Sequence, residues 1–238
     1  MCLLVVLHRV TDGAPLVVAA NREEFYARGG EPPRPLGGVP AAAGGVDPAH
    51  GGTWLGVNAH GLVVAVTNRR KSNPPGAPRS RGLLARDLLA SGSAEEAASQ
   101  AAAALEAGTY AGCNFLCADG QDCLVLHAGD SLQEQRLPPG LHVLANRDVN
   151  DPADRRVRQA TDWLASRPLG TSAEALATLP LLCASPEVCF RLADRGTVSS
   201  SLLALPARLE GGTYLHAQGP PDVTPYADVS HLLRKLRG

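Results

Sequence analysis

The strongest constraint on the fold is a series of short apolar runs that are joined by tight turns. Residues 3–8 and 15–20 are two runs rich in Val and Leu, and the Thr11-Asp12-Gly13-Ala14 segment between them is typical of a hairpin turn. A second pair follows, with Thr53–Val57 and Leu62–Thr67 on either side of another Gly-containing turn. Hairpins join antiparallel strands directly, whereas parallel strands need a long crossover. The first third of the chain therefore predicts antiparallel sheet.

Helical patterns interrupt the strands. Ser93-Ala94-Glu95-Glu96 forms a capping box before an Ala-rich stretch. Asp151 is the expected N-cap of a later helix, with Pro152 at its first position. Helices are predicted over residues 83–90, 93–107, 152–166 and 172–178 and in the basic C-terminal segment.

Strand patterns return after the helices. Cys113–Ala145 has short apolar runs broken by Gly- and Pro-containing turns, which predicts a four-strand meander, and further strands are expected at Val198–Leu205 and Thr213–His216. This order predicts an α+β fold, a layered sandwich in which helices cover antiparallel sheets. At 238 residues we expect one domain over residues 1–238.

Two segments have the composition of loops. Residues 28–52 are rich in Gly and Pro and are expected to form an ordered surface loop or meander. Residues 69–81 contain three Pro, one Gly and five basic residues, which predicts a mobile loop that could gate a site near Asn68.

Charge and hydropathy exclude several classes of protein. The formal net charge is -1, so neither a nucleic acid nor an anionic membrane is expected as partner. No run approaches the roughly 18 apolar residues of a membrane helix, and the apolar N-terminus is cut by His8 and Arg9, unlike a signal peptide. We therefore expect a cytoplasmic protein whose six Cys are free thiols.

Cys2 has a special chemistry if Met1 is removed. The residue then carries both a thiol and an α-amine, whose ordinary pKa of about 7.7–8.0 lets it accept the thiol proton. Nucleophile and base come from one residue, as in N-terminal Thr enzymes. The alternative is that Cys2 is a small buried side chain at the start of a strand, as free Cys usually is.

The end of the second strand supports the catalytic interpretation. A short hairpin would bring Asn21-Arg22-Glu23-Glu24 back beside the start of the chain, so that Arg22 lies near Cys2. A guanidinium there would favour the thiolate, and a nearby Glu could orient the terminal ammonium. Taken alone, such a polar run is also typical of a solvated strand end.

Short motifs spaced along most of the chain resemble those of one family. They are Met1–Leu4, Ala20–Phe25, Gly51–Val57, Val66–Arg69, Leu144–Arg147 followed by Asp151-Pro152, and Gly196–Ser200. In this order they resemble the NRDE family, also called the transport and Golgi organisation protein 2 family.

The resemblance implies a four-layer αββα sandwich of the N-terminal nucleophile hydrolase type. It implies that Cys2 is the nucleophile and Arg22 its neighbouring cation, with Glu23 in the same catalytic group. Asn68 and Asn146 are the expected oxyanion or substrate-amine contacts, and the expected substrate contacts are Trp54, Arg69 and Thr197. Two positions depart from the family pattern, because Glu23 replaces the usual Asp and Val198 the usual Arg.

Two functions remain open. The first is hydrolysis of a non-peptide amide bond, with a small-molecule substrate and no required cofactor. The second is haem binding or trafficking on the same fold, as the family has been linked to haem, with Cys2, the His or the four Tyr as conceivable ligands. A metal site is not expected, because the gaps between Cys113, Cys117 and Cys123 do not match a zinc motif. The oligomeric state is left open.

Overall fold

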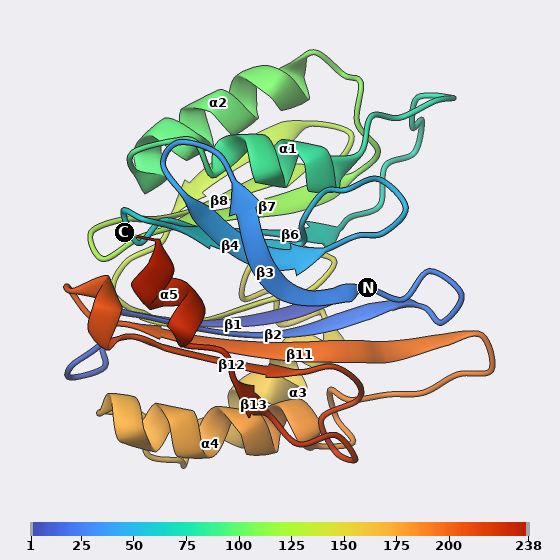
Figure 1. Ribbon diagram of the computed structural model, residues 1–238. Coiled ribbons are helices and arrows are strands. Elements are labelled where there is room, and N and C mark those ends of the chain that lie inside the picture. The colour runs from blue at the N-terminus through green and yellow to red at the C-terminus, as the bar shows by residue number, and fades with distance from the viewer. Residues whose placement is uncertain (1, 237–238) are drawn as a thin grey trace.

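The structure, a computed structural model, describes residues 2–236, whose strands form two antiparallel sheets that lie face to face (Figure 1). The first sheet has six strands in the order β10 (Gly140–Leu144), β1 (Cys2–His8), β2 (Leu16–Phe25), β11 (Arg195–Leu205), β12 (Thr213–Ala217) and β13 (Ala227–Asp228). The second has seven in the order β3 (Glu31–Gly37), β4 (Ala42–Val46), β5 (Leu55–Asn58), β6 (Val63–Asn68), β7 (Cys113–Ala118), β8 (Cys123–Ala128) and β9 (Leu132–Arg136).

Helices cover the two outer faces (Figure 1). The helices α1 (Arg81–Leu88) and α2 (Ala94–Glu106) pack on the second sheet, and α3 (Arg155–Leu164) and α4 (Ser172–Ala184) pack on the first. A short 3-10 turn, η1 (Leu209–Gly211), and α5 (His231–Lys235) contact each other beside β12. The predicted α+β architecture of four layers, αββα, is confirmed.

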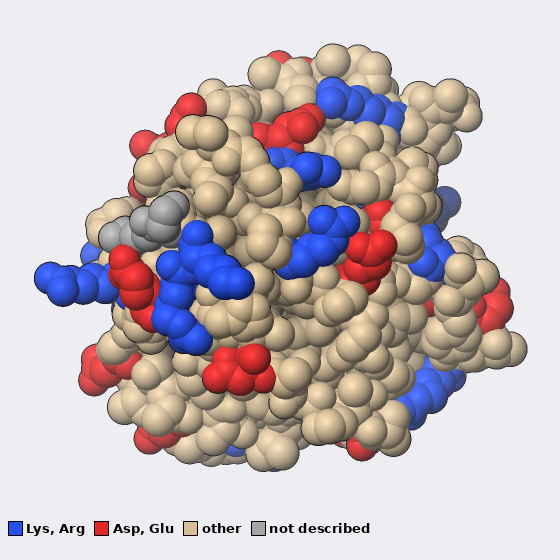
Figure 2. Space-filling view, viewed as in Figure 1, with Lys and Arg blue, Asp and Glu red and all other residues tan. Residues whose placement is uncertain are grey.

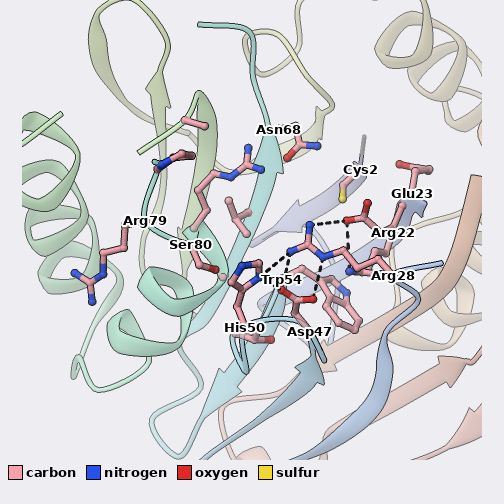
Figure 3. Close-up of a pocket in the computed structure, with 17 residues that line it drawn as sticks. Cys2, Arg22, Glu23, Arg28, Asp47, His50, Trp54, Asn68, Arg79 and Ser80 are labelled. Atoms are coloured by element: carbon pink, nitrogen blue, oxygen red, sulfur yellow. Dashed lines mark hydrogen bonds and ion pairs between the residues drawn. The ribbon is translucent and has the colours of Figure 1, made fainter. Parts of the chain in front are cut away.

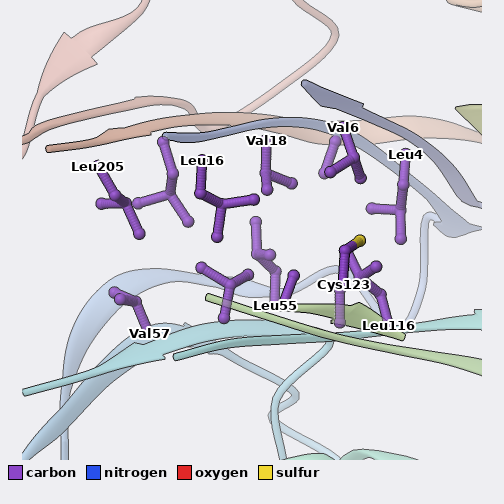
Figure 4. Close-up of a cluster of buried hydrophobic side chains, with 14 of the residues drawn as sticks. Leu4, Val6, Leu16, Val18, Leu55, Val57, Leu116, Cys123 and Leu205 are labelled. Atoms are coloured by element: carbon purple, nitrogen blue, oxygen red, sulfur yellow. The ribbon is translucent and has the colours of Figure 1, made fainter. Parts of the chain in front are cut away.

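Three apolar clusters fill the spaces between the layers, and alternate side chains of β1 belong to two of them. Leu4 and Val6 point between the sheets (Figure 4), whereas Leu3, Val5 and Leu7 point toward α3 and α4. Successive side chains of a strand face opposite sides, so a strand buried on both faces reads as a continuous apolar run. The first run of the chain is such a strand.

Of the two alternatives for residues 28–52, a surface loop or a meander, the structure has the second, because this range contains the antiparallel strands β3 and β4. The sequence of β3 is Glu-Pro-Pro-Arg-Pro-Leu-Gly, whose three prolines cannot donate to a ladder. The strand is nevertheless possible because it lies at the edge of the second sheet and pairs on one side only, with β4.

The four-strand meander is also corrected. Strands β7, β8 and β9 pair in sequence in the second sheet, but β10 crosses to the first sheet and pairs with β1. The helix α3 has Asp154 as N-cap, three residues after the expected Asp151. The helix α4 continues six residues beyond the predicted end at Thr178, and Pro180 lies within it.

The register of the strands shows which residues lie opposite Cys2 and Glu23. In the β1–β2 hairpin Cys2 is opposite Arg22, as expected. On the other side of β2, Glu23 is opposite Thr197, and the register then shifts between Thr197 and Ser199. Val198 is therefore the extra residue of a β-bulge, which bends a strand and redirects its side chains.

The surface carries mixed charge. Basic and acidic side chains lie side by side on the face shown in Figure 2, in keeping with the net charge of -1. Among residues 2–236, the helices are too short or too polar to span a bilayer.

Candidate active site

A cavity of about 240 Å³ opens where the two sheets meet at the start of β1 (Figure 3). Cys2 and Arg22 line it from the first sheet, and Trp54 and Asn68 from the second. The end of the loop that precedes α1 and the first two residues of the helix contribute Pro78 to Gly82. The cavity thus joins residues that are far apart in the sequence.

Cys2 is half-buried on the wall of this cavity. Burial raises the pKa of its thiol, and the carboxylate of Glu23 raises it further. The backbone N–H of Glu23 and the guanidinium of Arg22 act in the opposite direction. Met1, whose removal was expected, lies outside the described residues.

Arg22 is held rigidly beside Cys2. Only 5% of its surface is exposed, and its guanidinium stacks on the ring of Trp54 with 4.3 Å to the centroid. Nη1 donates to the carbonyl of Gly29, and Nη2 lies 3.6 Å from a carboxylate oxygen of Glu24. Such contacts compensate a cation for the loss of water.

Glu23 turns its carboxylate toward α3. Arg156 Nη2 donates to Oε1 at 2.7 Å, so Glu23 is held by an arginine that the sequence analysis did not assign to the site. Burial raises the pKa of Glu23 to about 7, although Arg156 opposes this shift. The carboxyl group can therefore hold or release a proton near neutral pH.

The two asparagines have different positions. Asn68 is exposed at the end of β6 and lines the cavity with Cys2. Asn146 lies just outside, where its Nδ2 donates to the backbone oxygen of Asn68 at 2.7 Å. The structure thus brings Asn68 to Cys2 and places Asn146 behind Asn68.

Two of the three expected substrate contacts lie elsewhere, while Trp54 lines the cavity. Arg69 lines a neighbouring depression and pairs with Asp148 at 2.6 Å. Thr197 is fully buried, where its hydroxyl accepts from the backbone N–H of Phe190 at 3.3 Å.

Sequence reasoning missed a polar cluster that lines the cavity. Arg28 binds both carboxylate oxygens of Asp47, at 3.0 and 2.7 Å, and His50 Nδ1 lies 3.2 Å from the same carboxylate. Burial alone would raise the pKa of Asp47, but Arg28 and His50 lower it to about 2. All three belong to the range predicted as a surface loop or meander, and the exact positions of β3 and β4 would have been needed to reveal them.

Comparison with known proteins identifies the family. The sequence model of the family described as Transport and Golgi organisation 2 matches residues 1–178. The chain belongs to this family. The human Transport and Golgi organization protein 2 homolog is 28% identical over 145 residues, which are 58% of this chain and 52% of the human protein. The chain thus spans about half the length of that curated relative.

Solved structures share the fold at low sequence identity. The Caenorhabditis elegans ortholog of N-acylethanolamine-hydrolyzing acid amidase has a TM-score of 0.62 and 14% identity, covering 87% of this chain and 94% of its own. A variant of conjugated bile acid hydrolase from Clostridium perfringens has a TM-score of 0.54 and 12% identity, covering 97% of this chain and 93% of its own. This family member therefore has the fold of the N-terminal nucleophile hydrolases.

Proposed function

We propose that this family member is an amidohydrolase that uses Cys2 as its nucleophile once Met1 has been removed. The observation that carries the proposal is the pairing of Cys2 with the buried Arg22 on the wall of a cavity that Asn68 also lines. The fold shared with a protein named as an N-acylethanolamine-hydrolyzing acid amidase supports it. Fold alone does not determine chemistry, so the site geometry carries the argument.

The proposed reaction begins at the front of the chain. The α-amine of Cys2 accepts the thiol proton, and the thiolate attacks the carbonyl carbon of the amide. As the tetrahedral intermediate collapses, the C–N bond breaks and the α-ammonium returns the proton to the leaving amine. Water, deprotonated by the same α-amine, then hydrolyses the thioester on Cys2 and releases the acid.

Neighbouring groups stabilise the charges that develop. Arg22 favours the thiolate, and the side-chain amide of Asn68 donates to the oxyanion, a contact typically worth about 3 kcal/mol. One N–H of Asn146 is already used on the backbone of Asn68, so in this proposal Asn146 positions Asn68.

Mass spectrometry tests the proposal. After incubation with 4-nitrophenyl hexanoate, we expect one hexanoyl adduct on the N-terminal peptide, and N-terminal sequencing should begin at Cys2. Cys2→Ala should abolish the adduct, whereas Cys189→Ala, which removes another thiol, should retain it. Turnover that persists in Cys2→Ala would refute the proposal.

An N-terminal extension tests the thiol of Cys2 as nucleophile separately from its α-amine as base. Inserting Ala between Met1 and Cys2 leaves the thiol in place but removes its α-amine. We expect alkylation of Cys2 to persist and turnover to be lost. Turnover equal to that of the unextended protein would show that the α-amine is not the base.

The cavity fits haem poorly. A porphyrin needs a wide apolar slot, whereas the wall around Cys2 carries Arg22, Arg28 and Asp47. The second conceivable ligand there, His50, has its Nδ1 beside Asp47 and Arg28. Haem titration of wild type and Cys2→Ala distinguishes the two functions, because a Soret shift lost in the variant would favour haem.

A further inference from the structure

The arginines that line the cavity differ in their partners. Arg81 donates to the carbonyl of Gly112 at 2.8 Å, and within residues 2–236 no carboxylate lies at ion-pair distance from it. The other three arginines of the cavity wall each pair with a carboxylate: Arg22 with Glu24, Arg28 with Asp47 and Arg79 with Asp87.

The hydrogen bond to the carbonyl of Gly112 shows where the guanidinium of Arg81 lies. The same oxygen accepts from the backbone N–H of Arg69 at 3.1 Å, and Gly112 directly precedes Cys113, the partner of Asn68 in the β6–β7 ladder. Arg81 therefore reaches the end of β6, next to Asn68. Arg81 is only half-buried and lines the cavity.

The position of Arg81 in its helix is electrostatically unfavourable. Ser80 is the N-cap of α1, so Arg81 is the first helical residue, and the first turn contains no acidic residue. The positive end of the helix dipole disfavours a cation at this position. Sequences break such local rules mainly at functional sites.

We propose that Arg81 binds a carboxylate of the substrate, so that the preferred substrates are small amides with a carboxylate close to the scissile bond. The proposal rests on the amidohydrolase function proposed above and adds its substrate class. A guanidinium matches a carboxylate geometrically, and such charge-assisted hydrogen bonds are stronger than neutral ones.

Binding to a catalytically inactive protein tests the substrate class independently of turnover. Calorimetry on full-length Cys2→Ala compares two matched pairs of probes. N-hexanoylglycine and N-hexanoylglycinamide differ in a charge on the amine side, and N-hexylsuccinamic acid and N-hexylsuccinamide differ in a charge on the acyl side. We expect the anionic member of at least one pair to bind about tenfold more tightly or better.

Variants at two arginines of the same wall identify the responsible cation. Arg81→Gln in the Cys2→Ala background should abolish the preference, and Arg81→Lys should restore part of it because the charge remains. Arg79→Gln is the matched control, because Arg79 pairs with Asp87 and extends away from Cys2 in Figure 3. Thermal unfolding checks that each variant is folded.

The outcomes separate this inference from the proposed function. Equal affinities within both pairs, no measurable binding by any of the four probes, or a preference that persists in Arg81→Gln would overturn the inference. An anionic preference that depends on Arg81, together with no acyl adduct on Cys2 in the wild type, would instead refute only the hydrolase.

Discussion

At the scale of single residues, Glu23 couples stability to pH. Its folded pKa is raised from the usual 4.5 to about 7 by burial. Between these values the folded protein keeps a proton that the unfolded chain has released, so the free energy of unfolding falls as the pH rises through this window. The shift corresponds to at most about 3 kcal/mol.

Glu23→Gln tests this coupling because glutamine cannot titrate. Urea unfolding at several values between pH 4.5 and 7.5 should show wild type losing stability relative to Glu23→Gln as the pH rises. The absolute stability of the variant is not the readout, since the substitution also changes the acceptor of the hydrogen bond from Arg156. Parallel pH profiles would contradict the raised pKa of Glu23.

Gly45 is a second residue on which the site depends. A Cβ added there would lie 2.3 Å from Cζ2 of Trp54, so the ring that supports Arg22 would have to move. Gly45→Ala should lower the free energy of unfolding by about 1–3 kcal/mol and slow acylation of Cys2. In the control Gly76→Ala no atom lies within 4 Å of the added Cβ, so stability and acylation should be unchanged.

The residues that could be predicted from the sequence share a physical property. Cys2 and Arg22 belong to one hairpin with a short turn, so local geometry alone brings them together. Arg81 and Arg156 reach the site from helices packed on opposite outer faces. Their positions depend on how the layers pack, which a single sequence does not reveal.

At the scale of secondary structure elements, Asn114 joins the two sheets beside the site. This fully buried residue of β7 donates to Thr67 Oγ1 at 3.1 Å and to the carbonyls of Ala145 and Arg147 at 3.3 and 3.2 Å. The two carbonyls flank Asn146, which in turn binds the backbone of Asn68. Asn114 therefore fixes the segment after β10 against the end of β6.

Asn114→Asp keeps the shape of the side chain but removes these donors. The carbonyl of Ala145 keeps its hydrogen bond from Thr67, but the carbonyl of Arg147 loses its donor and a carboxylate oxygen faces both carbonyls, which should lower the free energy of unfolding by about 2 kcal/mol. Because Asn68 would be less well positioned, acylation of Cys2 by the ester should slow, while alkylation of Cys2 by iodoacetamide should not, since it needs no oxyanion donor. An equal loss in both reactions would indicate a general disruption of the site.

Some helices and strands were predicted more accurately than others. Hairpins and capped helices depend on local turn and capping chemistry, and β1, β2 and α2 were predicted close to their observed bounds. The bounds of β3 within the expected loop or meander were not predicted, because its prolines are compatible with a strand only at a sheet edge. The crossing of β10 to the first sheet was missed because strand signals contain no information about which sheet a strand joins.

At the scale of the whole molecule, the apolar cluster between the sheets should make the four layers unfold together. Leu55 of β5 is 1% exposed and faces β1 and β2 across this cluster (Figure 4). Truncating a buried Leu typically costs about 2–5 kcal/mol, because the cavity that it leaves only partly collapses. Leu55→Ala should therefore destabilise both sheets, although Leu55 belongs to the second.

The two tryptophans monitor different parts of the sandwich. Trp54 packs against the second sheet and against Arg22 of β2, and Trp163 lies on α3, which covers the first sheet. In Trp163→Phe fluorescence reports on the second sheet and its contact with Arg22, and in Trp54→Phe on the first sheet. If residues 2–236 form one cooperative domain, Leu55→Ala should lower the denaturation midpoint by the same amount in both backgrounds. A midpoint that falls only in Trp163→Phe would mean that the two sheets unfold independently and that the cavity around Cys2 lies between two units.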